Sequence, residues 1–257
     1  MMSMNNLKAY DRDTQALGQI AGRLSWDQET MMPSGAVAQR GVEMAALEKV
    51  LHARKGAPQV RDLLETAQPQ TDMDAAILRE IRLSYNRATK VPADLAAEIA
   101  QVTSQAQGIW AQARADHDFA SFASTLDHVL RLKREEAQAL AGADGDVYDT
   151  MLQDYEPGLT ATDLEVMFGA MRPGLVDLRA AILDCPAPAP LDHTFDEVGQ
   201  LALSATVAQA FGYDLTRGRI DKAVHPFSSG SGLDVRITTR TASTDPFNCL
   251  YSTIHEV

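Results

Sequence analysis

The chain has 257 residues with 35 acidic and 23 basic side chains, a formal net charge of −12, and 45% hydrophobic residues. These values are typical of a globular protein with a sizeable core and argue against long disordered segments. The acidic surplus argues against a general nucleic-acid binder, because phosphate backbones are bound by clustered Lys and Arg. Two cysteines are too few for a disulfide framework, and neither a membrane-length apolar run nor a secretion signal is evident. We therefore expect a cytoplasmic protein that binds neither nucleic acid nor membrane.

Helix-favouring residues dominate almost the whole sequence, and apolar residues recur at spacings of three and four. This pattern predicts helices over residues 7–24, 36–52, 74–89, 92–116, 119–140, 162–183 and 195–211, and another that begins at Pro246 or Phe247. Thr160 and Thr162 precede acidic residues as in a capping box, and Thr194 stands three residues before Glu197 in the same way. Gly212 is expected to end its helix.

One segment, residues 233–240, alternates with β-branched side chains and predicts a strand, after the turn-rich residues 228–232. A Pro-rich run at residues 185–190 predicts a stiff extended connector. The expected fold class is therefore mainly α, a multi-helix fold with one small β element near residues 233–240. We expect residues 1–257 to form a single helical region.

The pair His255-Glu256 matches the first half of the motif H-E-x-x-H. In that motif two histidines four residues apart share a helix face and bind one Zn²⁺, and the Glu takes a proton from the metal-bound water. The second histidine would fall two positions beyond Val257, and the helix lacks the usual residues that end a helix. A truncated metal site is the hypothesis, and an ordinary helical His and Glu is the alternative.

Two other segments carry side chains suited to binding a peptide. The proline after His225 restricts its backbone, so this histidine can donate a hydrogen bond in a cleft or be a loop residue anchored by Phe227. Alternation along residues 234–240 places Arg236 and Arg240 on one polar face, where two guanidinium groups suit a carboxylate. The alternative is a half-buried edge strand with a solvated charged face.

The segment Trp26–Pro33 (WDQETMMP) contains Asp27 and Glu29, which can act as catalytic carboxylates. It offers no partner for either acid. The alternative is a helix end whose Trp and Met side chains fill the core.

Five segments now combine: residues 24–33 (LSWDQETMMP), 155–158 (YEPG), 225–227 (HPF), 234–240 (DVRITTR) and 254–256 (IHE). In this order they resemble the carboxypeptidase Taq family of zinc metallopeptidases, over nearly the whole chain. The resemblance implies a mostly helical, homodimeric enzyme that uses zinc to release single C-terminal residues from peptides with broad specificity.

The resemblance also implies residue roles. His255 resembles the first metal ligand, and Glu256 resembles the general base that activates the metal-bound water. His225, Arg236 and Arg240 lie in motifs that border the peptide groove, so we expect them to bind substrate.

Members of that family continue past the H-E pair with further ligands, whereas catalytic zinc needs three protein ligands and a water. We therefore expect the chain to be the N-terminal part of a larger metallocarboxypeptidase domain, truncated within H-E-x-x-H, with its zinc site incomplete and without activity by itself. The alternative function is a catalytically inactive helical fragment that dimerises or binds peptides.

Overall fold

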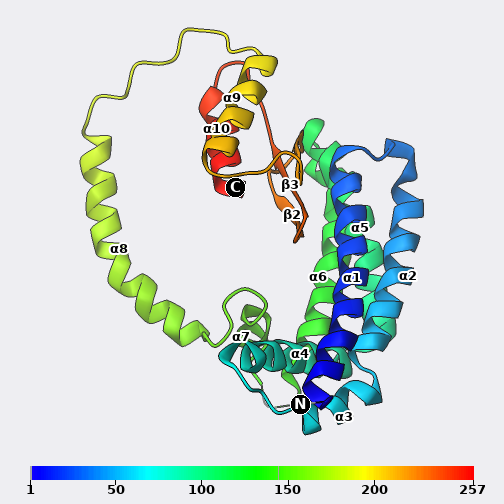
Figure 1. The fold of residues 1–257 in the computed structure, drawn as a ribbon. Helices are drawn as coiled ribbons and strands as arrows, with labels where there is room; N and C mark the ends of the chain where they lie inside the picture. Colours follow the sequence, from blue (N-terminus) through cyan, green and yellow to red (C-terminus); the bar gives the residue numbers. More distant parts are fainter. Residues whose placement is uncertain (1, 144) are drawn as a thin grey trace. The chain divides into compact units, whose positions relative to one another are not determined.

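A computed structural model describes residues 2–143 and 145–257 and shows a chain that is mostly helical (Figure 1). The helices are α1 (Met2–Thr30), the 3₁₀ helix η1 (Ser34–Ala36), α2 (Val37–Lys55), α3 (Pro58–Thr66), α4 (Asp72–Lys90), α5 (Ala93–Ala115), α6 (Phe119–Ala141), α7 (Val147–Leu152), α8 (Ala161–Leu183), α9 (Glu197–Ala210) and α10 (Pro246–Glu256). The strands are β1 (Ile220–Lys222), β2 (Ser228–Ser231) and β3 (Asp234–Thr239). The predicted fold class, mainly α with one small β element, is confirmed.

One of the two predicted helix caps is present in the structure, and the other is replaced by a different residue. Thr160 forms the predicted capping box at α8, with its side chain and that of Asp163 each accepting from the other's backbone. At α9 the prediction was wrong, because the cap is Asp196, whose carboxylate accepts from the Gly199 N–H, and not Thr194. A carboxylate directly before the first turn satisfies the free N–H groups more closely than a hydroxyl two residues earlier.

The structure divides into two compact units. Residues 2–133 and His193–Val257 form the first unit, which holds α1–α5, the sheet, α9 and α10. Arg134–Asp192 form the second, which holds α7 and α8; in it the Pro-rich residues 185–190 have no regular secondary structure. None of the helices in the described ranges is long and apolar enough to cross a membrane.

Two glycines allow α2 and α5 to approach closely in the first unit. A Cβ added at Gly41 of α2 would lie 2.9 Å from the side chain of Gln105 in α5, and one added at Gly108 of α5 would lie 2.9 Å from Val37 Cγ2 in α2. Real Cβ atoms do not pack this closely, so an alanine at either position would force the neighbouring side chain to shift. A second packing centre joins α1, α3 and α4 through Met4, Leu7, Val60, Leu64, Ala67 and Ile81.

The sheet places the predicted strand in its centre. β1 pairs with β3 in parallel and β2 pairs with it antiparallel, giving the order β1-β3-β2. The expectation of an edge strand with a solvated face is therefore wrong, and Ile237, Thr238 and Thr239 are fully buried. β3 packs against α10 and β2 packs against α1, so the sheet connects the N-terminal and C-terminal helices of the first unit.

Candidate functional site

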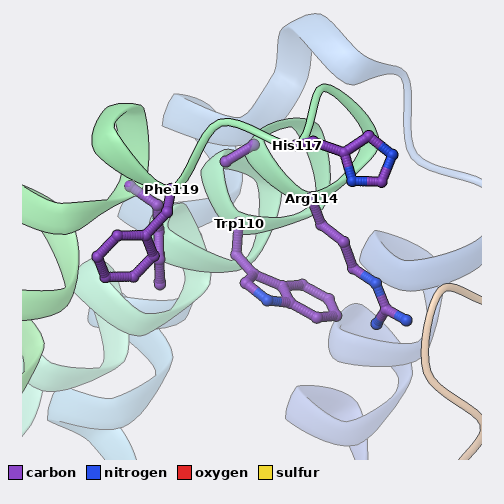
Figure 2. Close-up of a pocket in the computed structure, with 6 residues that line it drawn as sticks. Trp110, Arg114, His117 and Phe119 are labelled. Carbon is purple, nitrogen blue, oxygen red and sulfur yellow. The ribbon is translucent and has the colours of Figure 1, made fainter.

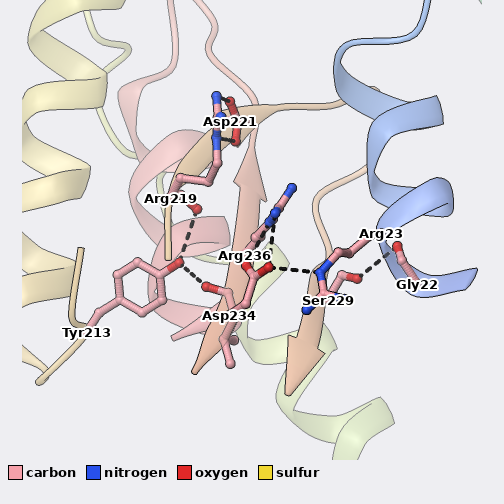
Figure 3. Close-up of polar contacts among 9 residues, drawn as sticks. Gly22, Arg23, Tyr213, Arg219, Asp221, Ser229, Asp234 and Arg236 are labelled. Atoms are coloured by element: carbon pink, nitrogen blue, oxygen red, sulfur yellow. Dashed lines mark hydrogen bonds and ion pairs between the residues drawn. The ribbon is translucent and has the colours of Figure 1, made fainter. Parts of the chain in front are cut away.

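The polar face of β3 is joined to α1 through a shared carboxylate. Asp234 accepts two hydrogen bonds from Arg236, from Nε at 2.8 Å and from Nη2 at 3.0 Å, and a third from Arg23 Nε of α1 at 3.0 Å (Figure 3). The hydrogen bond from Arg236, followed by that from Arg23, lowers the pKa of Asp234 to about 2. Asp234 is therefore ionised at neutral pH and holds the strand to the helix.

Trp26 of α1 lies beneath two guanidinium groups. The guanidinium carbon of Arg236 is 4.2 Å from the centre of the Trp26 ring, and that of Arg219 is 5.0 Å from it. Arg219 also donates two hydrogen bonds to Asp221, at 2.6 and 2.7 Å. Trp26 is 5% exposed, as the core interpretation predicted, whereas Met31 is 52% exposed and does not fill the core.

The turn before β1 is fixed by a half-buried phenol. Tyr213 Oη donates to the carbonyl of Val235 in β3 at 2.6 Å, and burial raises the pKa of this phenol (Figure 3). A Cβ added at Gly218 would lie 2.1 Å from both Tyr213 Oη and Val235 O, so only glycine fits beside them.

The end of β3 is joined to α10. Arg240 follows the strand and donates from Nε to the Asn248 side-chain oxygen at 2.7 Å. Thr239 Oγ1 donates to the Cys249 carbonyl at 3.0 Å, and Asp245 caps α10 by accepting from the Phe247 N–H. Hydrogen bonds to β3 and to Arg240 therefore hold the first two turns of α10, and Asp245 caps the helix.

His255 and Glu256 form the last turn of α10. Thr253 of the same helix is fully buried, and a position two residues later lies about 200° further round the helix, which explains why His255 is exposed. Glu256, about 300° from Thr253, is partly buried. Within the described part of the chain, neither side chain has a hydrogen-bond or ion-pair partner.

His225 is exposed in the loop between β1 and β2. Two residues later the Phe227 N–H donates to Thr238 Oγ1 at 2.8 Å, and the Thr238 N–H donates to the Phe227 carbonyl at 2.9 Å. The loop is thus anchored through Phe227.

The predicted site residues lie on β3 and directly after it, on α10, and in the loop between β1 and β2. Arg236 lies on β3 toward α1, Arg240 lies at the α10 end of β3, and His255 and Glu256 end α10. Among residues 2–143 and 145–257, no hydrogen bond or ion pair joins His225 to any of them. Across these same ranges, no group of three or more His, Cys, Asp or Glu side chains is arranged to hold a metal ion. A catalytic zinc takes three protein ligands, so the described residues do not fit a complete zinc site by themselves.

Other features of the first unit were not predicted as sites. A pocket of about 330 Å³ lies between the end of α5 and the start of α6. Trp110, Arg114, His117 and Phe119 are among its lining residues (Figure 2), and the Arg114 guanidinium carbon is 5.5 Å from the centre of the Trp110 ring. Glu29 of α1 accepts a hydrogen bond from Gln107 of α5, and burial raises the pKa of its carboxyl group. The sequence pattern gave no partner for Glu29, because Gln107 lies on another helix and is far from it along the chain.

Comparison with known proteins decides the family. Residues 6–257 match the model of the carboxypeptidase Taq (M32) metallopeptidases. The chain belongs to the M32 family.

Relatives support this assignment. The chain is 36% identical to thermostable carboxypeptidase 1 of Thermus thermophilus, over 98% of this chain and 53% of that protein. It is 31% identical to thermostable carboxypeptidase 1 of Pyrococcus furiosus, over 99% of this chain and 52% of that protein. The crystal structure of an M32 carboxypeptidase from Deinococcus radiodurans superposes with a TM-score of 0.83 at 30% identity, covering 100% of this chain and 52% of the other. The chain thus spans about half the length of the M32 relatives that it matches.

Proposed function

We propose that the full-length protein containing this chain is a zinc-dependent metallocarboxypeptidase that releases C-terminal amino acids from peptides with broad specificity. The observation that supports this most is the M32 family match over residues 6–257. The 36% identity to a thermostable carboxypeptidase across 98% of the chain agrees with it. A metal ion belongs to this family's chemistry, and zinc is the metal that we propose.

Within this proposal His255 is the first metal ligand. An exposed imidazole near the end of an anchored helix is available to a ligand, and neutral imidazole is a common ligand of zinc. The ligands that complete the site, including the second histidine of H-E-x-x-H, are proposed to lie outside these 257 residues. When bound, the metal would polarise the scissile carbonyl.

Glu256 is proposed as the general base. It follows His255 directly, is partly buried, and has no described side-chain partner that would compete for a proton. It would accept the proton of the attacking water and pass it to the leaving amine.

His225, Arg236 and Arg240 are proposed to bind the peptide. Arg236 uses Nε and one Nη2 hydrogen bond for Asp234, which leaves other donors of its five N–H groups for a carboxylate. Arg240 likewise commits Nε to Asn248 and keeps its terminal nitrogens. Both guanidinium groups are held in place before substrate binds, which lowers the entropy cost of recognition.

We further propose that the protein is a cytoplasmic homodimer and that residues 1–257 are the N-terminal part of one larger catalytic domain. The alternative is a catalytically inactive helical fragment that dimerises or binds peptides. That alternative is favoured by the lack of a three-ligand group among the residues the structure describes.

Metal reconstitution tests the proposal. The full-length protein is stripped with a chelator, and release of the C-terminal residue from a blocked dipeptide is measured before and after one equivalent of Zn²⁺ is added. We expect activity to vanish and return, and His255→Ala to lose both zinc stoichiometry and activity. The isolated 257-residue chain should show neither. Zinc-independent release by the stripped protein would contradict the proposal.

A further inference from the structure

Glu29 is a half-buried carboxylate without a cationic partner. It lies at the end of α1, and its Oε2 accepts a hydrogen bond from Gln107 Nε2 of α5. No lysine, arginine or histidine of the described residues forms an ion pair with it. Burial raises the pKa of its carboxyl group, and the hydrogen bond from Gln107 offsets only part of this effect.

Two adjacent cavities meet at this carboxylate. They share Gln28, Glu29 and Gln107 in their walls and have volumes of about 240 and 690 Å³. No lysine or arginine lines either cavity. Apolar side chains of the larger cavity come from Met32, Val37, Ile109, Ala111, Ala113 and Val224. The two cavities therefore place the carboxylate of Glu29 beside an apolar wall.

The polar groups beside Glu29 are already paired. Gln28 Nε2 donates to the Ser104 carbonyl at 2.6 Å, and Ser104 Oγ donates back to Gln28 Oε1 at 2.7 Å. A carboxylate offers about four acceptor sites, and Glu29 uses one of them. Among the described residues, Glu29 Oε1 accepts no hydrogen bond.

We propose that this cleft binds a primary alkylammonium group, with its nitrogen on Glu29 and its methylene chain along Met32, Val37 and Ala111. We propose an ammonium over a guanidinium, because Gln107 already donates to Oε2 and a bidentate guanidinium would have to share that oxygen. A lysine side chain and a linear diamine both have this chemistry. The inference does not depend on the carboxypeptidase activity.

Calorimetric titration of the purified full-length protein that contains this chain with 1,5-diaminopentane tests the site. We expect one molecule to bind, and 1,5-pentanediol, which has equal length and no charge, not to bind. Glu29→Gln should weaken diamine binding at least about fivefold, since it removes the charge on the site. The matched control is Asp13→Asn, which removes one charge from an exposed position of the same helix and should leave affinity within about twofold.

A second variant guards against unfolding as the cause. Ala111→Leu leaves every charge in place and narrows the apolar wall, so it should also weaken binding while circular dichroism stays unchanged. Equal diamine binding by the parent chain, Glu29→Gln and Ala111→Leu would overturn the proposal, as would no diamine binding at all.

Two further ligands identify the source of the ammonium group. Binding of Nα-acetyl-lysinamide as well as the diamine supports recognition of a peptide lysine, and binding of the diamine alone supports a free amine. Agmatine binding as tightly as 1,5-diaminopentane would contradict the preference for ammonium over guanidinium.

Discussion

The guanidinium carbon of Arg236 lies 4.2 Å from the centre of the Trp26 ring, so this side chain connects the central strand β3 to helix α1. The same guanidinium pairs with Asp234, which also accepts from Arg23 of α1. A cation over an indole contributes about 0.5–2 kcal/mol, more where water is excluded. The arginine proposed to bind substrate is therefore positioned by a helix near the opposite end of the sequence.

Replacing Trp26 tests this positioning. Trp26→Ala should lower the free energy of unfolding by about 3 kcal/mol, because it removes a buried ring and both cation–π contacts. Trp26→Phe should cost less than about 1.5 kcal/mol, since the buried indole N–H has no acceptor within the described residues and its loss breaks no hydrogen bond. Urea unfolding followed by circular dichroism measures both. Equal losses would contradict this account, because a phenyl ring would then recover none of the stability that the indole ring supplies.

The pKa of Asp234 predicts a pH-dependent contribution to stability. It falls from 3.8 to about 2 on folding, so the ionised pair stabilises the fold fully above about pH 4, and the contribution disappears as pH falls through 2. The shift corresponds to at most about 2.5 kcal/mol, and solvent screening of a side chain that is 32% exposed reduces this to about 1 kcal/mol.

Thermal unfolding of the parent chain and Asp234→Asn between pH 2 and pH 7 measures this contribution. The gap in stability should be full at pH 7 and close toward pH 2, while the control Asp13→Asn shows no such closing gap. A gap that stays constant over this range would contradict the assignment.

Gly108, packed against α2, and Gly18, on an open face of α1, predict alanine substitutions with effects of opposite sign. Gly108→Ala should destabilise the protein by about 1 kcal/mol, because its Cβ would lie 2.9 Å from Val37 Cγ2. Gly18→Ala in α1, where a Cβ meets nothing within 4 Å, should stabilise it by about 0.5–1 kcal/mol. Adding Val37→Ala should recover part of the Gly108→Ala loss. Urea unfolding measures each change, and destabilisation by Gly18→Ala would show that helix propensity does not decide the sign.

Sequence patterns predicted the long helices because each keeps its apolar spacing for several turns. The short elements were missed for physical reasons. The nine-residue α3 gives too few turns for a clear period, and β1 and β2 are three and four residues of Ile-Asp-Lys and Ser-Ser-Gly-Ser, which have no strand pattern of their own. Both strands exist because β3 supplies hydrogen-bond partners on its two sides.

In the candidate site too, the sequence predicted the local features and missed the long-range contacts. Local spacing placed Arg236 on a strand and His255 near a helix end, and the structure agrees with both. The contact of Arg236 with Trp26 and the bond from Gln107 to Glu29 are long-range, so no local pattern contains them. The roles of His225, Arg236, Arg240, His255 and Glu256 in the site all stay predictions.

The role of Glu256 is the part of the account that a single measurement tests most directly. In the full-length protein, kcat for release of a C-terminal amino acid should fall at least about 100-fold in Glu256→Gln, because a general base contributes roughly 10²–10⁴ in rate. Zinc stoichiometry should remain that of the parent protein, since the glutamate is not proposed as a ligand. An unchanged kcat in Glu256→Gln with zinc bound would contradict the proposed mechanism.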